Sequence, residues 1–297
     1  MDGIIVVNKG EGITSQGVVS RVKRLFSVSK AGHTGTLDPL ATGVLPVLVG
    51  RGVKASEFML SSDKYYRAEL TLGITTDTED ITGEVLTRSE LPMPSEEEVL
   101  ECIRSFVGNI RQTPPMYSAL KVGGKKLCDL AREGITVERE PRDITVFSID
   151  ALRIDDKRYS LRVHCSKGTY IRTLCANIGA YLGCGAAMSA LERTQSGDFL
   201  IENAHTIDEL ENMTEKEREA LLLPPESLFE GAPCVRFSEF FTRIFKSGCE
   251  IYQKKINTNF PVGTYVRVYE GDEFLALAEV KEYEGGSAIK SKKFFKI

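Results

Sequence analysis

Asp38 is the residue whose surroundings in the chain best suit it for chemistry. It is the only acidic residue between Glu11 and Glu57, an interval that also holds six lysines and arginines. Because nearby cations favour the ionised form of a carboxyl group, we expect a carboxylate that can act as a nucleophile or a base. The glycines and Pro39 around it predict a stiff loop. A bare Leu-Asp-Pro, however, is most often a turn or a helix cap.

Tyr66 and Arg172 are two further candidates, and each has an ordinary structural alternative. Tyr66 lies on the apolar face of an alternating segment, residues 64–73, which predicts a strand with this ring at its inner end. Arg172 falls in the first turn of a predicted helix that Thr169 caps, off the apolar stripe of that helix. A cation there opposes the helix macrodipole and needs a partner. Alone, Tyr66 is typical of a core aromatic, and Arg172 could equally be a surface residue.

A framework of strands and helices must bring these residues together. Apolar runs and alternation predict strands, which fall at residues 4–8, 44–49, 64–73 and twice within 142–166. Amphipathic patterns predict one helix capped by Thr14 or Ser15 and another that begins at Ser95, with Glu98 completing a capping box. The mixture indicates an α+β protein.

The composition excludes several classes of protein. The 297 residues, 42% hydrophobic and 27% charged, are ordinary for a globular chain with one large and one small domain. No apolar run reaches the length of a membrane span, and the strand-like start at Gly3–Val7 lacks the layout of a signal peptide. Seven scattered cysteines without a Cys-x-x-Cys pair, and three separated histidines, argue against a disulfide framework or a metal site. We therefore expect a cytoplasmic location.

The charges are distributed in blocks, although the net charge is only −4. Three blocks, residues 12–56, 102–128 and 157–191, hold 16 of the 38 basic residues and one of the 42 acidic residues. If these blocks meet in space, they form a basic cleft that attracts a polyanion. The alternative is that each block is a separate solvated face.

Four motifs, in order from Lys9 to about Thr194, resemble the TruB family, the tRNA pseudouridine-55 synthases. The contiguous run GHTGTLDPLATGVL at residues 32–45 closely resembles the family signature. The others are KGEGITS at 9–15, where Gly10 replaces the family proline, Lys64-x-Tyr66 followed by TTDTEDITG at 75–83, and CSKGTYIRTL at 165–174. The resemblance implies a pseudouridine-synthase fold, in which helices and loops flank a central mixed, mainly antiparallel sheet.

The resemblance also implies roles for single residues. Asp38 corresponds to the catalytic aspartate, Tyr66 to the tyrosine that stacks on the target base, and Arg172 to the arginine that pairs with the aspartate. Tyr66 is also a candidate for the late proton transfer. His33 corresponds to the histidine that fills the space left by the flipped base, and its alternative is a loop histidine bonded to backbone. Lys9 is either a buried structural cation or a contact near the active site.

Further RNA contacts and the domains follow from the same resemblance. An insertion at about residues 112–140 resembles the RNA clamp of the bacterial stand-alone enzymes. The expected RNA-binding residues are His33, Lys9, Lys64, Lys121, Lys125, Lys126, Lys167 and Tyr170. We expect a catalytic domain at 1–231 and a small β-rich, PUA-like RNA-binding domain at 232–297, which ends in four lysines.

The implied reaction breaks the N1–C1′ bond of uridine and rejoins the base through C5. It is an isomerisation with no net loss of atoms and no redox change, so we expect neither cofactor nor metal. The expected partner is the T-arm stem-loop of tRNA, with no DNA and no membrane, and the protein is expected to be a monomer. Alternatives are a guide-RNA-dependent relative, disfavoured by the insertion, and a non-catalytic RNA chaperone, disfavoured by Asp38, Tyr66 and Arg172 together. A zinc base deaminase would need His-x-Glu and Pro-Cys-x-x-Cys motifs, which are missing.

Overall fold

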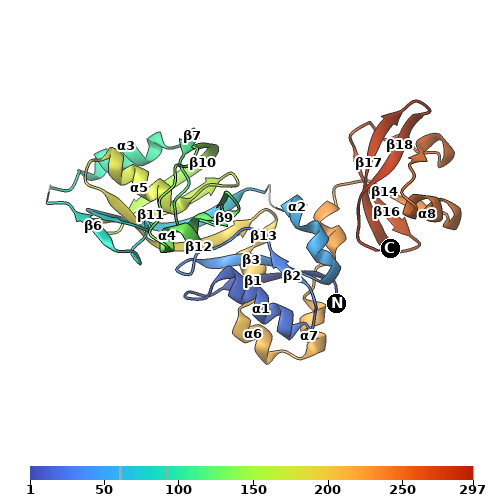
Figure 1. Ribbon diagram of the computed structural model, residues 1–297, viewed down its shortest axis with the longest axis horizontal. Helices are drawn as coiled ribbons and strands as arrows, with labels where there is room; N and C mark the ends of the chain where they lie inside the picture. Colours follow the sequence, from blue (N-terminus) through green and yellow to red (C-terminus); the bar gives the residue numbers. More distant parts are fainter. Residues whose placement is uncertain (60–61, 91, 297) are drawn as a thin grey trace.

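The protein is built around two β-sheets, of nine and five strands, in a computed structural model that describes residues 1–59, 62–90 and 92–296. Figure 1 shows the five-stranded C-terminal sheet to one side of the larger sheet, beyond the short helix α2 (Ser56–Met59). The combination of a mixed sheet, flanking helices and a C-terminal β-rich part confirms the predicted α+β class.

The larger sheet is mainly antiparallel. Its strands run in the order β1 (Gly3–Lys9), β3 (Thr42–Val49), β12 (Ala186–Ser196), β4 (Lys64–Leu72), β11 (Arg158–Cys165), β10 (Arg142–Arg153) and β7 (Gly108–Gln112). Two short strands join it, β2 (Ala31–His33) on β3 and β13 (Phe199–Leu200) on β12. The pair β3–β12 is parallel, so the sheet is mixed as expected.

The apolar alternation of β4 explains which face of the sheet is covered. Tyr66, Ala68, Leu70 and Leu72 are all buried in the main core, whereas Tyr65 and Arg67 on the other face are exposed. Four helices pack on the larger sheet around this core: α1 (Ser15–Leu25), α3 (Glu96–Ser105), α5 (Ile171–Tyr181) and α6 (Ile207–Asn212). The helix α7 (Glu215–Ala220) follows α6 and has no buried residue.

Helix caps follow the sequence in two cases and depart from it in a third. Thr14 caps α1 by accepting a hydrogen bond from Gly17 N, and Ser95 with Glu98 forms the predicted capping box. The prediction that Thr169 caps α5 is wrong. The cap residue is Tyr170, without a side-chain bond, and the Thr169 hydroxyl donates backwards to Ser166 O. Threonine forms such local bonds in loops as readily as it caps helices.

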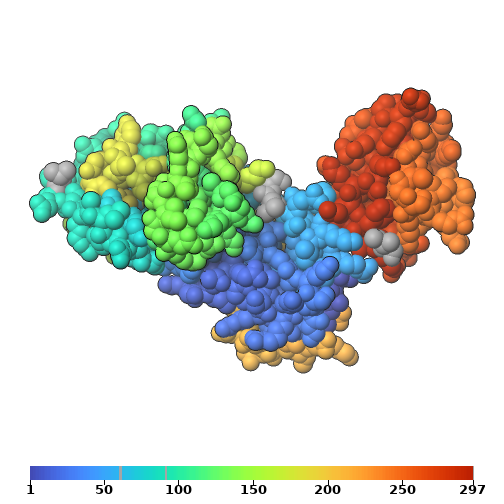
Figure 2. All heavy atoms as spheres, in the orientation of Figure 1, coloured from blue at the N-terminus to red at the C-terminus, as the bar shows by residue number. Residues whose placement is uncertain are grey.

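The insertion at 112–140 is a small unit of its own. It contains the strands β8 (Lys121–Val122) and β9 (Lys125–Lys126), paired with each other, and the helix α4 (Leu127–Arg132). Figure 2 shows these light-green residues as a lobe in front of the larger sheet. A second small pair is formed by β5 (Ile74–Thr76) and β6 (Val85–Arg88). The segment that connects these two strands, residues 77–84, is called the threonine-rich loop below.

The C-terminal sheet runs in the order β14 (Cys234–Phe237), β16 (Tyr265–Glu270), β17 (Glu273–Tyr283), β18 (Gly286–Phe294) and β15 (Ile251–Tyr252), with helix α8 (Glu239–Lys246) beside it. The remaining helical elements are 3₁₀ turns, at Gly50–Ala55, Ile201–Asn203, Pro225–Phe229 and Gln253–Lys255. Four aromatic residues join this part of the chain to the 3₁₀ and α2 region, namely Phe58, Phe229, Phe274 and Phe295.

The terminal lysines are all engaged in ion pairs. Lys290 pairs with Glu250, Lys292 with Glu279, Lys293 with Glu57 and Lys296 with Glu273. The run of lysines after Glu284 therefore does not form the free basic surface that its sequence suggests, because carboxylates from elsewhere in the chain neutralise it. No helix in the described ranges is long and apolar enough to cross a bilayer.

Candidate active site

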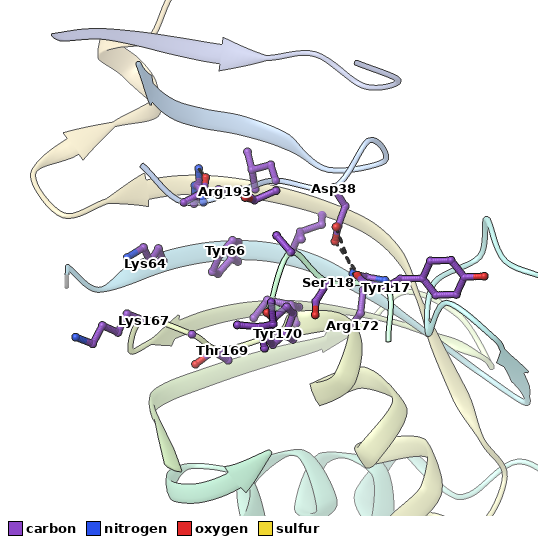
Figure 3. A pocket seen from close by; sticks show the side chains of 18 of the residues that line it. Asp38, Lys64, Tyr66, Tyr117, Ser118, Lys167, Thr169, Tyr170, Arg172 and Arg193 are labelled. Carbon is purple, nitrogen blue, oxygen red and sulfur yellow. Dashed lines mark hydrogen bonds and ion pairs between the residues drawn. The ribbon is translucent and has the colours of Figure 1, made fainter. Parts of the chain in front are cut away.

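The candidate site is a cavity of about 310 Å³ beside the Asp38 loop. Figure 3 shows the Asp38 side chain pointing toward Arg172 and joined to it by a dashed line, with Lys64 and Tyr66 on one strand and Arg193 on the neighbouring strand. Its lining comes from five segments: residues 35–38, Lys64 and Tyr66 of β4, residues 117–120 of the insertion, residues 166–172, and Leu191 with Arg193 of β12. The three acid-poor blocks of the sequence thus meet here, although only Lys167 and Arg172 among their 16 bases line this cavity.

The Asp38 loop is held on both sides by side chains of the N-terminal segment. Ser15 Oγ donates to Leu37 O at 2.9 Å and accepts from Leu37 N at 2.8 Å. Lys9 Nζ donates to Pro39 O at 3.2 Å and also to Ala41 O. The residues immediately before and after Asp38 are therefore fixed, which limits the movement of its carboxylate.

Lys9 is fully buried, and its ammonium group donates to backbone carbonyls. Burial lowers the pKa of Lys9 to about 8, and the nearby Asp38 opposes this effect. This placement favours the structural cation over a direct RNA contact.

Asp38 and Arg172 form a two-point ion pair. Arg172 Nε lies 2.9 Å from Asp38 Oδ2, and Arg172 Nη2 donates to Asp38 Oδ1 at 3.2 Å. Arg172 is buried, with 5% of its side chain exposed, whereas a third of the Asp38 side chain remains accessible from the cavity. A planar guanidinium paired this way fixes the orientation of a carboxylate as well as its charge.

Burial raises the pKa of Asp38 above its ordinary value, while Arg172 opposes the rise. This corrects the expectation that basic neighbours in the sequence hold Asp38 ionised. Arg21, Lys23 and Arg24 lie on the exposed side of α1, where solvent screens their charges. Desolvation of the carboxyl group therefore dominates the pKa of Asp38. The compensating charge comes instead from Arg172. A carboxylate with a raised pKa is a stronger base and nucleophile once it is ionised.

Asp80 is a site residue that the sequence reasoning did not single out. Its Oδ2 lies 3.7 Å from Arg172 Nη1, and its Oδ1 accepts hydrogen bonds from Thr82 N and from the Thr78 hydroxyl, each at 2.9 Å. Thr78 O also accepts from Arg172 Nη1 at 2.7 Å. Asp80 thus holds the far side of the guanidinium. The density of threonines at 75–83 was the available signal, since hydroxyls often serve a buried carboxylate.

Arg193 is a second site residue that sequence reasoning missed. It is buried, and it donates from Nε to Val44 O at 2.7 Å and from Nη2 to Gly35 O at 3.0 Å. In the described ranges, no carboxylate lies within ion-pair distance of Arg193. Leu191 and Arg193 share one face of β12, and this period of two could have placed both at the cavity.

Tyr66 lies at the cavity wall, 9% exposed, and in cross-strand register with Arg193. Burial raises the pKa of Tyr66, and the positive charge of nearby Arg193 opposes the rise. Tyr66 is therefore a neutral phenol at the cavity wall, with a cation close to it.

The expected RNA contacts fall into two groups. Lys64, Lys167 and Tyr170 line the cavity, and burial lowers the pKa of Lys64 to about 8. His33 in β2 is not among the lining residues. Its Nδ1 is buried and has no hydrogen-bond partner within the described ranges, and burial lowers the pKa of the ring. The lysines of the insertion, Lys121, Lys125 and Lys126, lie outside the cavity on the exposed β8–β9 pair. Lys125 Nζ lies 3.7 Å from Glu133 Oε2.

No group of three or more His, Cys, Asp or Glu side chains within the described ranges is arranged to hold a metal ion. The chemistry that the site offers is that of an oriented carboxylate beside an aromatic ring, in a cavity that four cations line, Lys64, Lys167, Arg172 and Arg193.

Comparison with known proteins places the chain in a family. A family model described as TruB family pseudouridylate synthase (N terminal domain) matches residues 23–171, and one described as tRNA pseudouridylate synthase B C-terminal domain matches 172–230. The tRNA pseudouridine synthase B of Clostridium tetani is 43% identical over 98% of this chain and 99% of its own length. That of Alkaliphilus oremlandii is 44% identical over 95% of this chain and 94% of its own.

Solved structures agree with these sequence matches. A chain in an H/ACA RNP bound to a substrate RNA containing 2′-deoxyuridine is 26% identical, with a TM-score of 0.70, over 99% of this chain and 85% of that one. A chain in a Cbf5–Nop10–Gar1 complex is 27% identical, with a TM-score of 0.69, over 99% and 84%. The resemblance inferred from the four motifs is confirmed: the chain belongs to the TruB family of pseudouridylate synthases.

Proposed function

We propose that this protein is a stand-alone tRNA pseudouridine synthase that converts the uridine at position 55, in the T-arm loop, to pseudouridine. The observation that carries the proposal is the buried two-point pair of Asp38 and Arg172 at the wall of a cavity that also holds Tyr66. Relatives named tRNA pseudouridine synthase B, similar over nearly the whole chain, support the substrate class.

The reaction is an isomerisation whose atoms and electrons balance within the nucleotide. The N1–C1′ bond breaks and its electron pair leaves with the base; C5 of the turned base then bonds to C1′. The C5 proton is lost, and N1 gains one. Three first steps are open to the Asp38 carboxylate: attack at C1′, addition at C6, or removal of the 2′ proton. Each needs Asp38 ionised and aimed, which is what Arg172 provides.

Tyr66 and Arg193 have complementary roles in this proposal. The Tyr66 ring supports the detached base by stacking, and its hydroxyl is positioned for the late proton transfer from C5. The positive charge of Arg193 lies near that hydroxyl and favours its ionised form. A base within a helical stack cannot reach such a cavity, so the target nucleotide must flip out of the T-loop.

The partner is the T-arm stem-loop of tRNA, and we propose that the protein binds it as a monomer in the cytoplasm, without DNA. The lysines of the 112–140 insertion would grip the phosphate backbone outside the cavity. We propose a catalytic domain at 1–231 and an RNA-binding, PUA-like domain at 232–297. Because the terminal lysines are ion-paired, RNA contacts of the second domain would come from other groups.

A guide-RNA-dependent enzyme is the second candidate, because the similar solved structures include a chain of an H/ACA RNP. The identities favour the stand-alone enzyme: 43% and 44% to the two synthase B relatives, against 26% and 27% to the two structural neighbours. A chaperone without catalysis would not need the buried Asp38–Arg172 pair, since one carboxylate adds nothing to a phosphate-dominated interface.

The test is tritium release from tRNA transcripts that carry 5-tritiated uridine, run beside filter binding. The purified protein alone should release tritium, and a transcript with cytidine at position 55 should lose that release. Asp38→Asn should abolish release and leave the Kd for tRNA within about twofold. Asp143→Asn, an exposed carboxylate paired with Arg111, is the matched control and should behave as the wild type.

Two outcomes would contradict the proposal. Tight binding without release by the wild type would indicate a chaperone, and release that appears only with an added guide RNA would indicate the guide-dependent alternative. Unchanged release by Asp38→Asn would remove the assignment of the catalytic carboxylate.

A further inference from the structure

The guanidinium of Arg172 has one partner that belongs to the insertion. Its Nη2 donates to the backbone carbonyl of Tyr117 at 2.7 Å, and the same nitrogen donates to Asp38 Oδ1 at 3.2 Å. Nε is used by Asp38, and Nη1 by Thr78 O and Asp80. A guanidinium has five N–H donors, so the Tyr117 carbonyl completes the set.

The side chain of Tyr117 reaches in the opposite direction. Figure 3 shows its ring extending away from Asp38, on the far side of Arg172. Its hydroxyl donates to Asp77 Oδ2 at 3.1 Å, and this bond raises the pKa of Tyr117. Asp77 is itself anchored, because its Oδ1 accepts from Glu84 N at 2.7 Å. Tyr117 therefore bridges the catalytic arginine and the threonine-rich loop that holds the other side of the same arginine.

The root of the insertion is fixed to the body of the protein by separate contacts. The Gln112 side chain donates to Tyr170 O at 3.0 Å and accepts from Tyr170 N at 2.8 Å. Within the insertion, Arg139 Nη1 donates to Pro114 O at 3.0 Å, which ties the two ends of the insertion to each other. Beyond these points, Lys121 and Lys126 face each other on the exposed β8–β9 pair. Tyr117 thus lies between a fixed root and a tip that carries free cations.

We propose that Tyr117 is a positioning residue that couples the seating of the 112–140 insertion to the orientation of Asp38. When the insertion is seated, the Tyr117 carbonyl takes the remaining donor of Arg172, and the Tyr117–Asp77 bond latches that arrangement. When the insertion lifts, a buried N–H of Arg172 loses its acceptor, and the guanidinium is free to turn from Asp38. Gripping RNA at the tip would then aim the carboxylate. This inference rests on the proposed function.

The alternative is that Tyr117 only shapes the insertion or helps it bind RNA. The two roles differ in what they change. A latch that aims Asp38 changes the rate of the chemical step at saturating enzyme, whereas a gripping role changes the Kd for RNA.

The experiment compares Tyr117→Phe, Asp77→Asn and the double variant with the wild type, by single-turnover pseudouridine formation and by filter binding. Tyr117→Phe removes only the latching hydroxyl. Asp77→Asn keeps an oxygen for Glu84 N but replaces the charged acceptor of the latch. Tyr181→Phe is the matched control, because Tyr181 is 74% exposed on α5 and does not line the cavity.

Each single variant should lower the single-turnover rate about threefold to tenfold, the range for one ordinary hydrogen bond, because the Tyr117–Asp77 bond is exposed to solvent; the Kd should stay within about twofold. The double variant should be no slower than the slower single variant, because both remove the same bond. Tyr181→Phe should match the wild type.

Unchanged rates for both single variants, additive losses in the double variant, or a loss confined to the Kd would each overturn the latch. Melting temperatures of all variants show whether a lost rate reflects misfolding, and in that case Asp77→Asn decides. An inactive wild type would instead disprove the proposed function, on which this inference depends.

Discussion

The carboxylate of Asp38 and the guanidinium of Arg172 meet through two contacts of 2.9 and 3.2 Å, although 134 residues separate them in the chain. Asp38 comes from the loop between β2 and β3, and Arg172 from the first turn of α5. The position at the helix N-terminus, unfavourable for a cation, is compensated by Asp38, Asp80 and two backbone carbonyls. Arg172 thereby fixes the orientation of the Asp38 carboxylate, which otherwise belongs to a loop.

The pH dependence of the reaction should reveal this pair. Burial raises the pKa of Asp38 and Arg172 opposes the rise, so the rate should increase with pH through the Asp38 pKa as the carboxylate ionises. Arg172→Gln removes the opposing charge, and the acidic limb of the profile should move to higher pH. Arg172→Lys keeps the charge but loses the two-point geometry, so we expect a smaller shift and a rate at least about tenfold lower.

Single-turnover rates between about pH 5 and about pH 8 would measure these limbs. Lys167→Gln, which removes a cation from the cavity rim, is the control for a general change of field. An acidic limb that stays in place in Arg172→Gln would show that another group sets it.

Lys9 should make the stability of the protein depend on alkaline pH. Its pKa is about 8 in the folded protein, against an ordinary 10.5, so between these values the unfolded chain binds more protons. The contribution of Lys9 to the free energy of unfolding therefore rises with pH across this window. Relative to Lys9→Met, the wild type should gain on the order of 3 kcal/mol between about pH 8 and about pH 10.5. Urea unfolding at several pH values measures the difference, and a constant difference would show that Lys9 is not buried as a cation.

The insertion lysines should contribute to tRNA affinity through phosphates. Lys121→Gln and Lys126→Gln should each weaken binding and lower the slope of log K against log salt concentration by about 1. Lys290→Gln is the control, because Lys290 is already paired with Glu250 and should leave the slope unchanged. Equal slopes for all three variants would place the RNA path away from the insertion.

The C-terminal part should be held by its aromatic residues more than by the ion pair across the junction. Phe295 is 4% exposed and lies 5.1 Å from the Phe274 ring, so Phe295→Ala should cost about 3 kcal/mol. Lys293→Met breaks the half-exposed pair with Glu57 and should cost less than about 1 kcal/mol. Urea unfolding followed by circular dichroism measures the free energy of unfolding of both variants. A larger loss in Lys293→Met than in Phe295→Ala would show that the ion pair contributes more to the junction than the aromatic residues.

Much of the fold could be predicted from local patterns. The alternation in 64–73 corresponds to β4, the apolar run at 44–49 lies within β3, and the Ser95–Glu98 box starts α3. These predictions succeeded because strand alternation and helix capping depend on residues within a few positions of one another. Thr169 failed as a cap because the helix begins at Ile171, one residue later than predicted, so the cap position falls on Tyr170.

The sequence by itself determined the family, through four ordered motifs, and it named Asp38, Tyr66 and Arg172 by resemblance to that family. Only the tertiary structure decided that Asp38 has a raised pKa, that Arg193 and Asp80 support the site, and that the terminal lysines are neutralised. The physical reason is that burial and charge pairing depend on atoms within a few ångströms in space. Residues such as Asp38 and Arg172, 134 positions apart, become electrostatic neighbours only when the chain folds.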